Sequence, residues 1–178
     1  MDAEKSLGAY LTDHMAGSVL ATDLTKRGAT QNDGPLAQFF TDLSREIEID
    51  RRTLNTVAEK LGVEASPLKE AGAVVAERLS RFKIDHRITG SRQLSLLLEL
   101  ELLYLGIEGK HTLWRTLRVL HDQDARLAEF DFDKLSLRAQ EQLSAVEERR
   151  LAVAVDALSS RTPATSSGTA VTGSGSGR

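Results

Sequence analysis

Hydrophobic residues recur every three or four positions along four long stretches of this chain. The most regular stretch covers residues 36–61, where one face is apolar at every position except one. Its members are Leu36, Phe40, Leu43, Ile47, Asp50, Leu54, Val57 and Leu61. This spacing places the side chains on one side of an α-helix. It therefore predicts a helix about 40 Å long that ends at Gly62.

Similar patterns predict three further long helices, over residues 3–27, 91–120 and 133–158. The first of these is followed by Gly28, which we expect to end the helix as a left-handed cap. A serine–proline pair, which is typical of a helix start, predicts a shorter helix over residues 68–82. The expected order is therefore long, long, short, long, long.

The lengths of the connections predict how these helices pack. Short links join the first two long helices and the last two, which makes each pair an antiparallel hairpin. The longer segment 63–90 must carry the chain from one hairpin to the other. The sequence therefore predicts an all-α, antiparallel four-helix bundle of the ferritin-like type, with a short helix in the long crossover between the second and third long helices. A five-helix array in which all neighbours are antiparallel is the alternative.

Three residues in the middle of the third long helix bear on its packing. Gly106 and Gly109 disfavour a helix relative to alanine, so we expect a neighbouring helix to approach closely there. Trp114, one turn further on, is expected to be a core residue or a subunit-contact anchor.

Composition narrows the possible functions. The 178 residues contain no Cys, which excludes disulfides, a thiol nucleophile and Cys-ligated metal sites. The net charge of -3 does not favour nucleic-acid binding. The most apolar window, residues 94–107, is interrupted by Glu99 and Glu101 and is too short to span a membrane. With no signal-peptide pattern at Met1, the expected location is the cytoplasm.

The composition changes near the C-terminus. Residues 159–178 are rich in Ser, Thr and Gly, with Val171 as the only large apolar side chain. Such a segment cannot bury enough apolar surface to offset the entropy lost on ordering. We therefore expect a helical bundle over residues 1–158 and a disordered tail over 159–178, in which a docking peptide is the alternative to a plain flexible end.

A few polar residues interrupt the apolar faces of the long helices. Those on or beside the faces are His14, Glu46, Asp50, Glu101, Glu108 and Arg150. Charged side chains are almost never fully buried without partners. If the faces meet in one core, two arrangements satisfy these groups: a cation held by carboxylates and imidazole, or an internal network of ion pairs and hydrogen bonds.

The helix order and this polar layer resemble the ferritin-like superfamily over about residues 3–158. Local sequence supports the resemblance in the segments Tyr10-Leu-Thr-Asp-His-Met-Ala-Gly-Ser18, Leu98-Glu-Leu-Glu101 and Gly106-Ile-Glu-Gly-Lys110, and at Trp114. These segments are similar to a bacterial branch distinct from ferritin, bacterioferritin and the starvation-type mini-ferritins. The resemblance implies iron oxidation, iron storage or oxygen-dependent chemistry at a carboxylate-bridged metal pair.

The ligand set of that family is incomplete in this chain. The family centre takes one Glu from each of two helices and a Glu-x-x-His pair from each of the other two. The single pair here is Glu108 with His111, on the third long helix, whereas the family carries the pairs on the second and fourth. Arg150 would supply a positive charge in place of a metal. The candidate ligands for iron or manganese are His14, Asp50, Glu101 and Glu108, with Glu46 and His111 as weaker candidates.

The sequence therefore favours a ferritin-like bundle that is not an enzyme, or one whose catalysis has diverged. In it, His14, Asp50, Glu101, Glu108 and Arg150 would form a buried polar network. The alternative is an iron- or manganese-binding oxidoreductase or iron-handling protein. We expect a homo-oligomer that binds neither nucleic acid nor membrane; an adaptor that binds a partner protein is a third reading.

Overall fold

The computed structural model describes residues 3–63 and 91–159. In these residues it contains four long helices: α1 (Ala3–Gln31), α2 (Gly34–Lys60), α5 (Arg92–His121) and α6 (Phe132–Leu158). A short 3-10 helix, η1 (Ala125–Leu127), lies between α5 and α6, and the described residues contain no strand. The prediction of an all-α protein with four long helices is confirmed. The predicted short helix over residues 68–82 and nearly all of the predicted tail lie outside the described residues.

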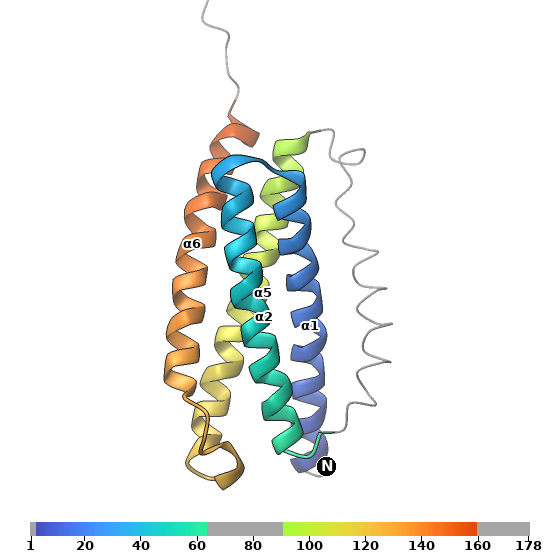
Figure 1. The fold of residues 1–178 in the computed structure, drawn as a ribbon, viewed down its shortest axis with the longest axis vertical. Helices are drawn as coiled ribbons and strands as arrows, with labels where there is room; N and C mark the ends of the chain where they lie inside the picture. Colours follow the sequence, from blue (N-terminus) through green and yellow to red (C-terminus); the bar gives the residue numbers. More distant parts are fainter. Residues whose placement is uncertain (1–2, 64–90, 160–178) are drawn as a thin grey trace, which may run out of the picture.

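The long helices pack side by side along their length (Figure 1). Figure 1 shows α1 and α2 running in opposite directions, and α5 and α6 likewise, whereas α2 and α5 run in the same direction. Two residues, Asn32 and Asp33, join α1 to α2. The principal packing pairs are α1 with α2, α5 with α6, and α1 with α5.

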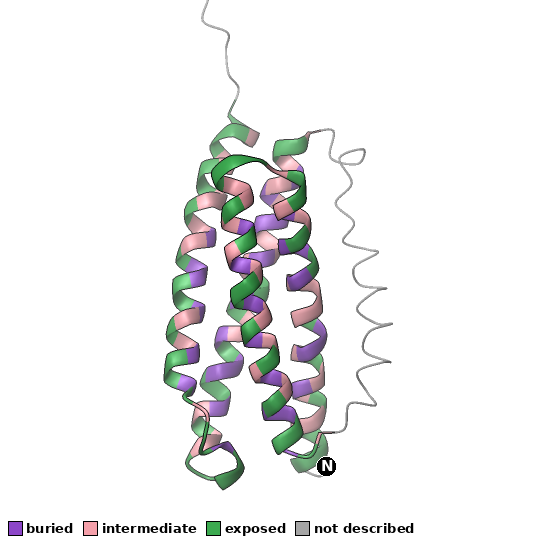
Figure 2. Ribbon diagram, viewed as in Figure 1, coloured by how far each residue is buried: buried purple, intermediate pink, exposed green. Residues whose placement is uncertain are grey.

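The apolar stripe of α2 forms one wall of the core. Phe40, Leu43, Ile47, Leu54 and Val57 are all buried, as the three-and-four spacing predicts. Figure 2 shows buried residues along the inward faces of the helices and exposed residues on the outside. Because the stripes meet in one continuous core, the polar residue within the α2 stripe is enclosed with them.

A second part of the core is aromatic. Trp114 of α5 has no exposed surface, which confirms its predicted place in the core. Its ring stacks on Phe132, at the start of α6, with 6.2 Å between centroids. This contact fixes the indole ring against the neighbouring helix.

Local residues account for several helix ends. The Ser91 hydroxyl accepts a hydrogen bond from the Leu94 amide at 3.4 Å, and the Asp131 carboxylate accepts one from the Lys134 amide at 2.9 Å. Both side chains satisfy amides that a helix start leaves without a partner. Gly62 has a positive φ of 74° and follows α2, so the predicted stop is correct.

The predicted end of the first helix at Gly28 is wrong. The helix continues to Gln31, and Gly28 is buried within it. A Cβ at this position would lie 2.5 Å from ring atoms of Phe40. The glycine therefore provides space for the Phe40 ring between α1 and α2. The side chain of Asn32 donates to the Gly28 carbonyl oxygen at 2.8 Å, which satisfies one of the last carbonyls of the helix.

No helix in the described residues combines the length and the apolar character needed to cross a lipid bilayer.

Candidate functional site

A buried carboxylate lies at the middle of the bundle. Asp50 of α2 is 2% exposed and forms ion pairs through both of its oxygens. The Lys110 ammonium of α5 pairs with Oδ2, and the Arg138 guanidinium of α6 pairs with Oδ1. One carboxylate thus holds cations from two different helices.

Gln142 of α6 extends these contacts. Its Nε2 donates to Glu46 Oε2 at 2.9 Å and lies 3.4 Å from Asp50 Oδ2. Its Oε1 accepts a hydrogen bond from Lys110 Nζ. We call the set Glu46, Asp50, Lys110, Arg138 and Gln142 the Asp50 network. It joins α2, α5 and α6. Asp50 and Gln142 are buried, Lys110 and Arg138 are partly buried, and Glu46 is exposed at the edge of the network.

The surroundings of Lys110 disfavour its charged form. Burial lowers the pKa of the Lys110 ammonium below its usual range, while the negative charge of Asp50 acts in the opposite direction. Within a weakly polar interior, such charges are tolerated when they are paired and hydrogen-bonded. The network therefore meets the condition for a stable ionic core, except that Arg138 Nε is buried without a hydrogen-bond partner.

The structure does not bring the sequence-predicted residues of the polar layer together around Asp50. Arg150 contacts Glu147 at 2.7 Å and Glu101 at 3.6 Å, on a part of the bundle where Glu101 is 44% exposed. Glu108 is 48% exposed and lies 3.6 Å from His111. Of the five residues expected to form the buried network, Asp50 alone belongs to the Asp50 network.

The helical phase explains this outcome. At about 100° per residue, Glu101 and Glu108 lie about 180° and 160° around α5 from Lys110. They therefore occupy nearly the opposite side of the helix. Arg150 is eight residues beyond Gln142, which rotates it by about 80° around α6. Apolar residues surround most of α5, so its sequence did not show which side faces the core.

His14 lies apart from these contacts. Its ring packs edge-on against Tyr10 of the same helix, with 4.6 Å between centroids. Burial lowers the pKa of His14, and the charge of Asp13 partly opposes that effect. His14 and Asp50 line the same cavity, but no ion pair or hydrogen bond joins them among the described contacts.

His111 is 8% exposed, and neither of its ring nitrogens has a hydrogen-bond partner. It lines a polar cavity with Arg115, Arg118 and Asp133, and Arg118 is paired with Asp133. Two guanidinium groups against one carboxylate leave a positive charge beside the imidazole, which disfavours the binding of a further cation there.

The candidate ligands therefore do not fit a di-metal centre. Across residues 3–63 and 91–159, no three His, Asp or Glu side chains are grouped closely enough to hold a metal ion. Asp50, the one buried carboxylate among the candidate ligands, already has both oxygens occupied by cations of the chain itself.

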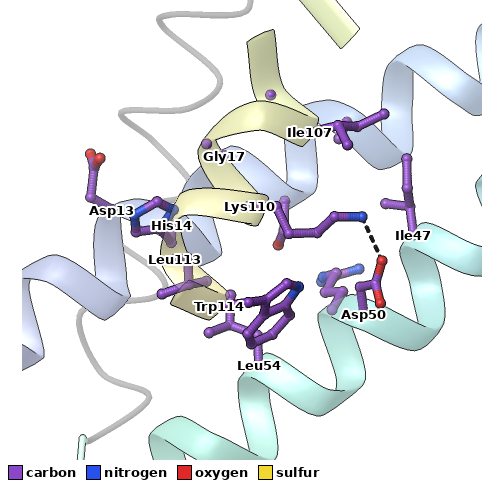
Figure 3. A pocket seen from close by; sticks show the side chains of 15 residues that line it. Asp13, His14, Gly17, Ile47, Asp50, Leu54, Ile107, Lys110, Leu113 and Trp114 are labelled. Carbon is purple, nitrogen blue, oxygen red and sulfur yellow. Dashed lines mark hydrogen bonds and ion pairs between the residues drawn. The ribbon is translucent and has the colours of Figure 1, made fainter. Parts of the chain in front are cut away.

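A cavity of about 220 Å³ lies between α1, α2 and α5 (Figure 3). Gly17, Gly106 and Gly109 line it, and nothing lies within 4 Å of a Cβ placed at any of them. The expected close approach of a neighbouring helix at Gly106 and Gly109 is therefore wrong. The missing side chains leave open space between α1 and α5.

Sequence reasoning missed three members of the Asp50 network: Lys110, Arg138 and Gln142. A signal for two of them was present in α6. Arg138 and Gln142 lie three and seven residues after the buried Leu135, and these spacings place all three on one face. This spacing does not by itself predict that Arg138 and Gln142 face the core, because long polar side chains can reach solvent from the edge of an apolar face.

Comparisons with family models, with curated proteins and with solved structures find no match for this chain. The fold and the site define an all-α protein with an ionic network around the buried Asp50.

Proposed function

We propose that this protein is a ferritin-like bundle in which the Asp50 network takes the place of a di-metal centre. The bundle is non-catalytic or catalytically diverged, and it does not carry out redox chemistry at a metal. The observation that carries the proposal is the double ion pair of Asp50, because the ammonium and the guanidinium already neutralise the one fully buried carboxylate among the candidates.

The course of the helices supports the ferritin-like part of the proposal. Two oppositely directed pairs, α1 with α2 and α5 with α6, are combined with parallel α2 and α5 (Figure 1). A bundle with one long crossover between its second and third long helices has this combination of directions.

Self-association is a further part of the proposal. Several large apolar side chains are exposed on the outer faces of α5 and α6. On α6, Leu151, Val155 and Leu158 lie three or four residues apart on one face, near the end of the helix. Burial of such a face against a second copy would remove apolar surface from water.

Elemental analysis tests the proposal. The full chain is purified from cells supplied with iron and manganese, and its metal content and its mass in solution are measured together. We expect less than one equivalent of metal per chain and a homo-oligomer. Stoichiometric, tightly bound metal would overturn the proposal that the Asp50 network takes the place of a metal centre. A monomeric mass would overturn the proposed self-association.

The alternative is an iron- or manganese-binding oxidoreductase or iron-handling protein. The observation in its favour is the contact of 3.6 Å between Glu108 and His111, with both imidazole nitrogens free of hydrogen bonds. Under this alternative, the purified protein contains bound metal, and Glu108→Gln or His111→Ala removes it. The protein also consumes oxygen when ferrous ion is added. Glu59→Gln, at an exposed carboxylate of α2, is the matched control.

A further inference from the structure

The cavity between α1, α2 and α5 has a size and a lining that suit a small organic molecule. Its volume is about 220 Å³, and apolar side chains such as Ile47, Leu54, Ile107 and Leu113 form much of its wall. An apolar cavity of roughly 150 Å³ binds benzene, which has six non-hydrogen atoms. By the same ratio, this cavity has room for about nine.

One buried polar group in the wall has no partner. Trp114 lines the cavity and has no exposed surface, yet its indole Nε1 makes no hydrogen bond. Figure 3 shows the indole nitrogen on the edge of the ring turned toward Asp50 and Lys110. Because Phe132 stacks on the ring, the indole is held in place. A buried donor without a partner is rare in proteins, and an acceptor on a bound molecule would satisfy it.

The polar floor of the cavity restricts the charge of that molecule. Lys110 and Asp50 line it and are paired with each other, and Asp13 and Arg51 also line the cavity. These two carboxylates and two cations offer no net charge to attract an ionic ligand, and an unpaired charge in a mostly apolar cavity is strongly disfavoured. The occupant that fits is therefore neutral.

Three glycines of α1 and α5 line the cavity. A Cβ at Gly17, Gly106 or Gly109 would meet nothing within 4 Å. Larger residues at these positions would extend into the space that the cavity now occupies.

From these observations, we infer that the cavity binds a neutral molecule of about nine non-hydrogen atoms, whether or not the Asp50 network replaces a metal. A carbonyl oxygen of this molecule accepts a hydrogen bond from Trp114 Nε1. No curated protein or family model matches this chain to assign such a site.

The single tryptophan makes the inference directly testable, because the full chain has one indole N–H resonance. The full-length protein, labelled with ¹⁵N, is titrated with acetophenone and, separately, with α-methylstyrene. The second compound has the same shape but carries a methylene group in place of the carbonyl oxygen. We expect acetophenone to move the indole proton resonance downfield and to bind about three- to tenfold more tightly, which is the range of a net neutral hydrogen bond.

Substitutions at the glycines test the location. Gly106→Leu should fill the cavity and weaken acetophenone binding at least tenfold, whereas Thr112→Leu, at an exposed residue of the same helix, should leave it unchanged. Gly17→Leu fills the cavity from α1 and serves as a second variant if Gly106→Leu fails to fold. Absence of a saturable shift, equal binding of the two compounds, or full binding by both folded glycine variants would overturn the inference.

Discussion

Replacement of the central carboxylate is the most direct test of the ionic core. Asp50→Asn keeps the shape of the side chain but removes its negative charge. The Asp50 side chain is 2% exposed, Lys110 is 15% exposed and Arg138 is 27% exposed. The substitution therefore leaves two largely enclosed cations without their shared partner.

The loss of unfolding free energy in Asp50→Asn depends on how far each cation can reach water. Loss of one partner from a buried ion pair costs about 3–5 kcal/mol. Arg138 is partly exposed and has a long side chain that can turn toward solvent, whereas Lys110 is enclosed. We therefore expect the lower end of the range, about 3 kcal/mol. For a domain of this size, the corresponding fall in Tm is roughly 6–12 °C.

Lys110→Met separates the effect of charge from that of packing. Methionine keeps an unbranched side chain, and Asp50 retains Arg138 and Gln142 as partners. We expect this variant to lose about 1 kcal/mol, because one hydrogen-bonded partner of the carboxylate remains charged. The double variant, Asp50→Asn with Lys110→Met, no longer has the enclosed ammonium. Its loss of unfolding free energy should therefore be at least about 1 kcal/mol smaller than the sum of the two single losses.

Urea unfolding measures these differences, with far-ultraviolet circular dichroism and the fluorescence of Trp114 as two independent probes. The exposed substitution Glu59→Gln is the matched control for replacing a carboxylate by an amide, and it should leave the midpoint unchanged. A loss below about 1 kcal/mol for Asp50→Asn, or strict additivity in the double variant, would refute the ionic core.

Three further changes test other contacts. Gly28→Ala places a methyl group 2.5 Å from ring atoms of Phe40 and should lower the free energy of urea unfolding by about 2 kcal/mol; an unchanged value would contradict tight packing there. Because burial lowers the pKa of His14 below 6.5, the unfolded chain takes up the proton first and stability falls as the pH drops from about 7 to 5. His14→Gln should reduce that fall, and an identical pH profile would contradict it. Arg150→Gln removes partly exposed contacts with Glu147 and Glu101 and should lower the free energy of urea unfolding by at most about 1 kcal/mol; a loss as large as that of Asp50→Asn would place Arg150 in the core.

The positions of the helices could be predicted because they depend on local patterns. The stripe along α2 requires only that apolar residues return to one side every three or four positions, and both the helix and its end at Gly62 follow from that rule. Gly28 shows where local rules fail. Glycine is typical of a helix end, but the ring of Phe40 occupies the space beside it, and that contact comes from a different helix.

Four long helices, an apolar face on α2 and a carboxylate within that face that requires partners all follow from the pattern of residues along the chain. The partners of Asp50 do not follow from that pattern. Lys110 and Arg138 reach it from α5 and α6, and their contact depends on how each helix is rotated about its own axis. An apolar surface around most of α5 is compatible with several rotations, so the side that faces Asp50 is settled by the packing of all the helices together.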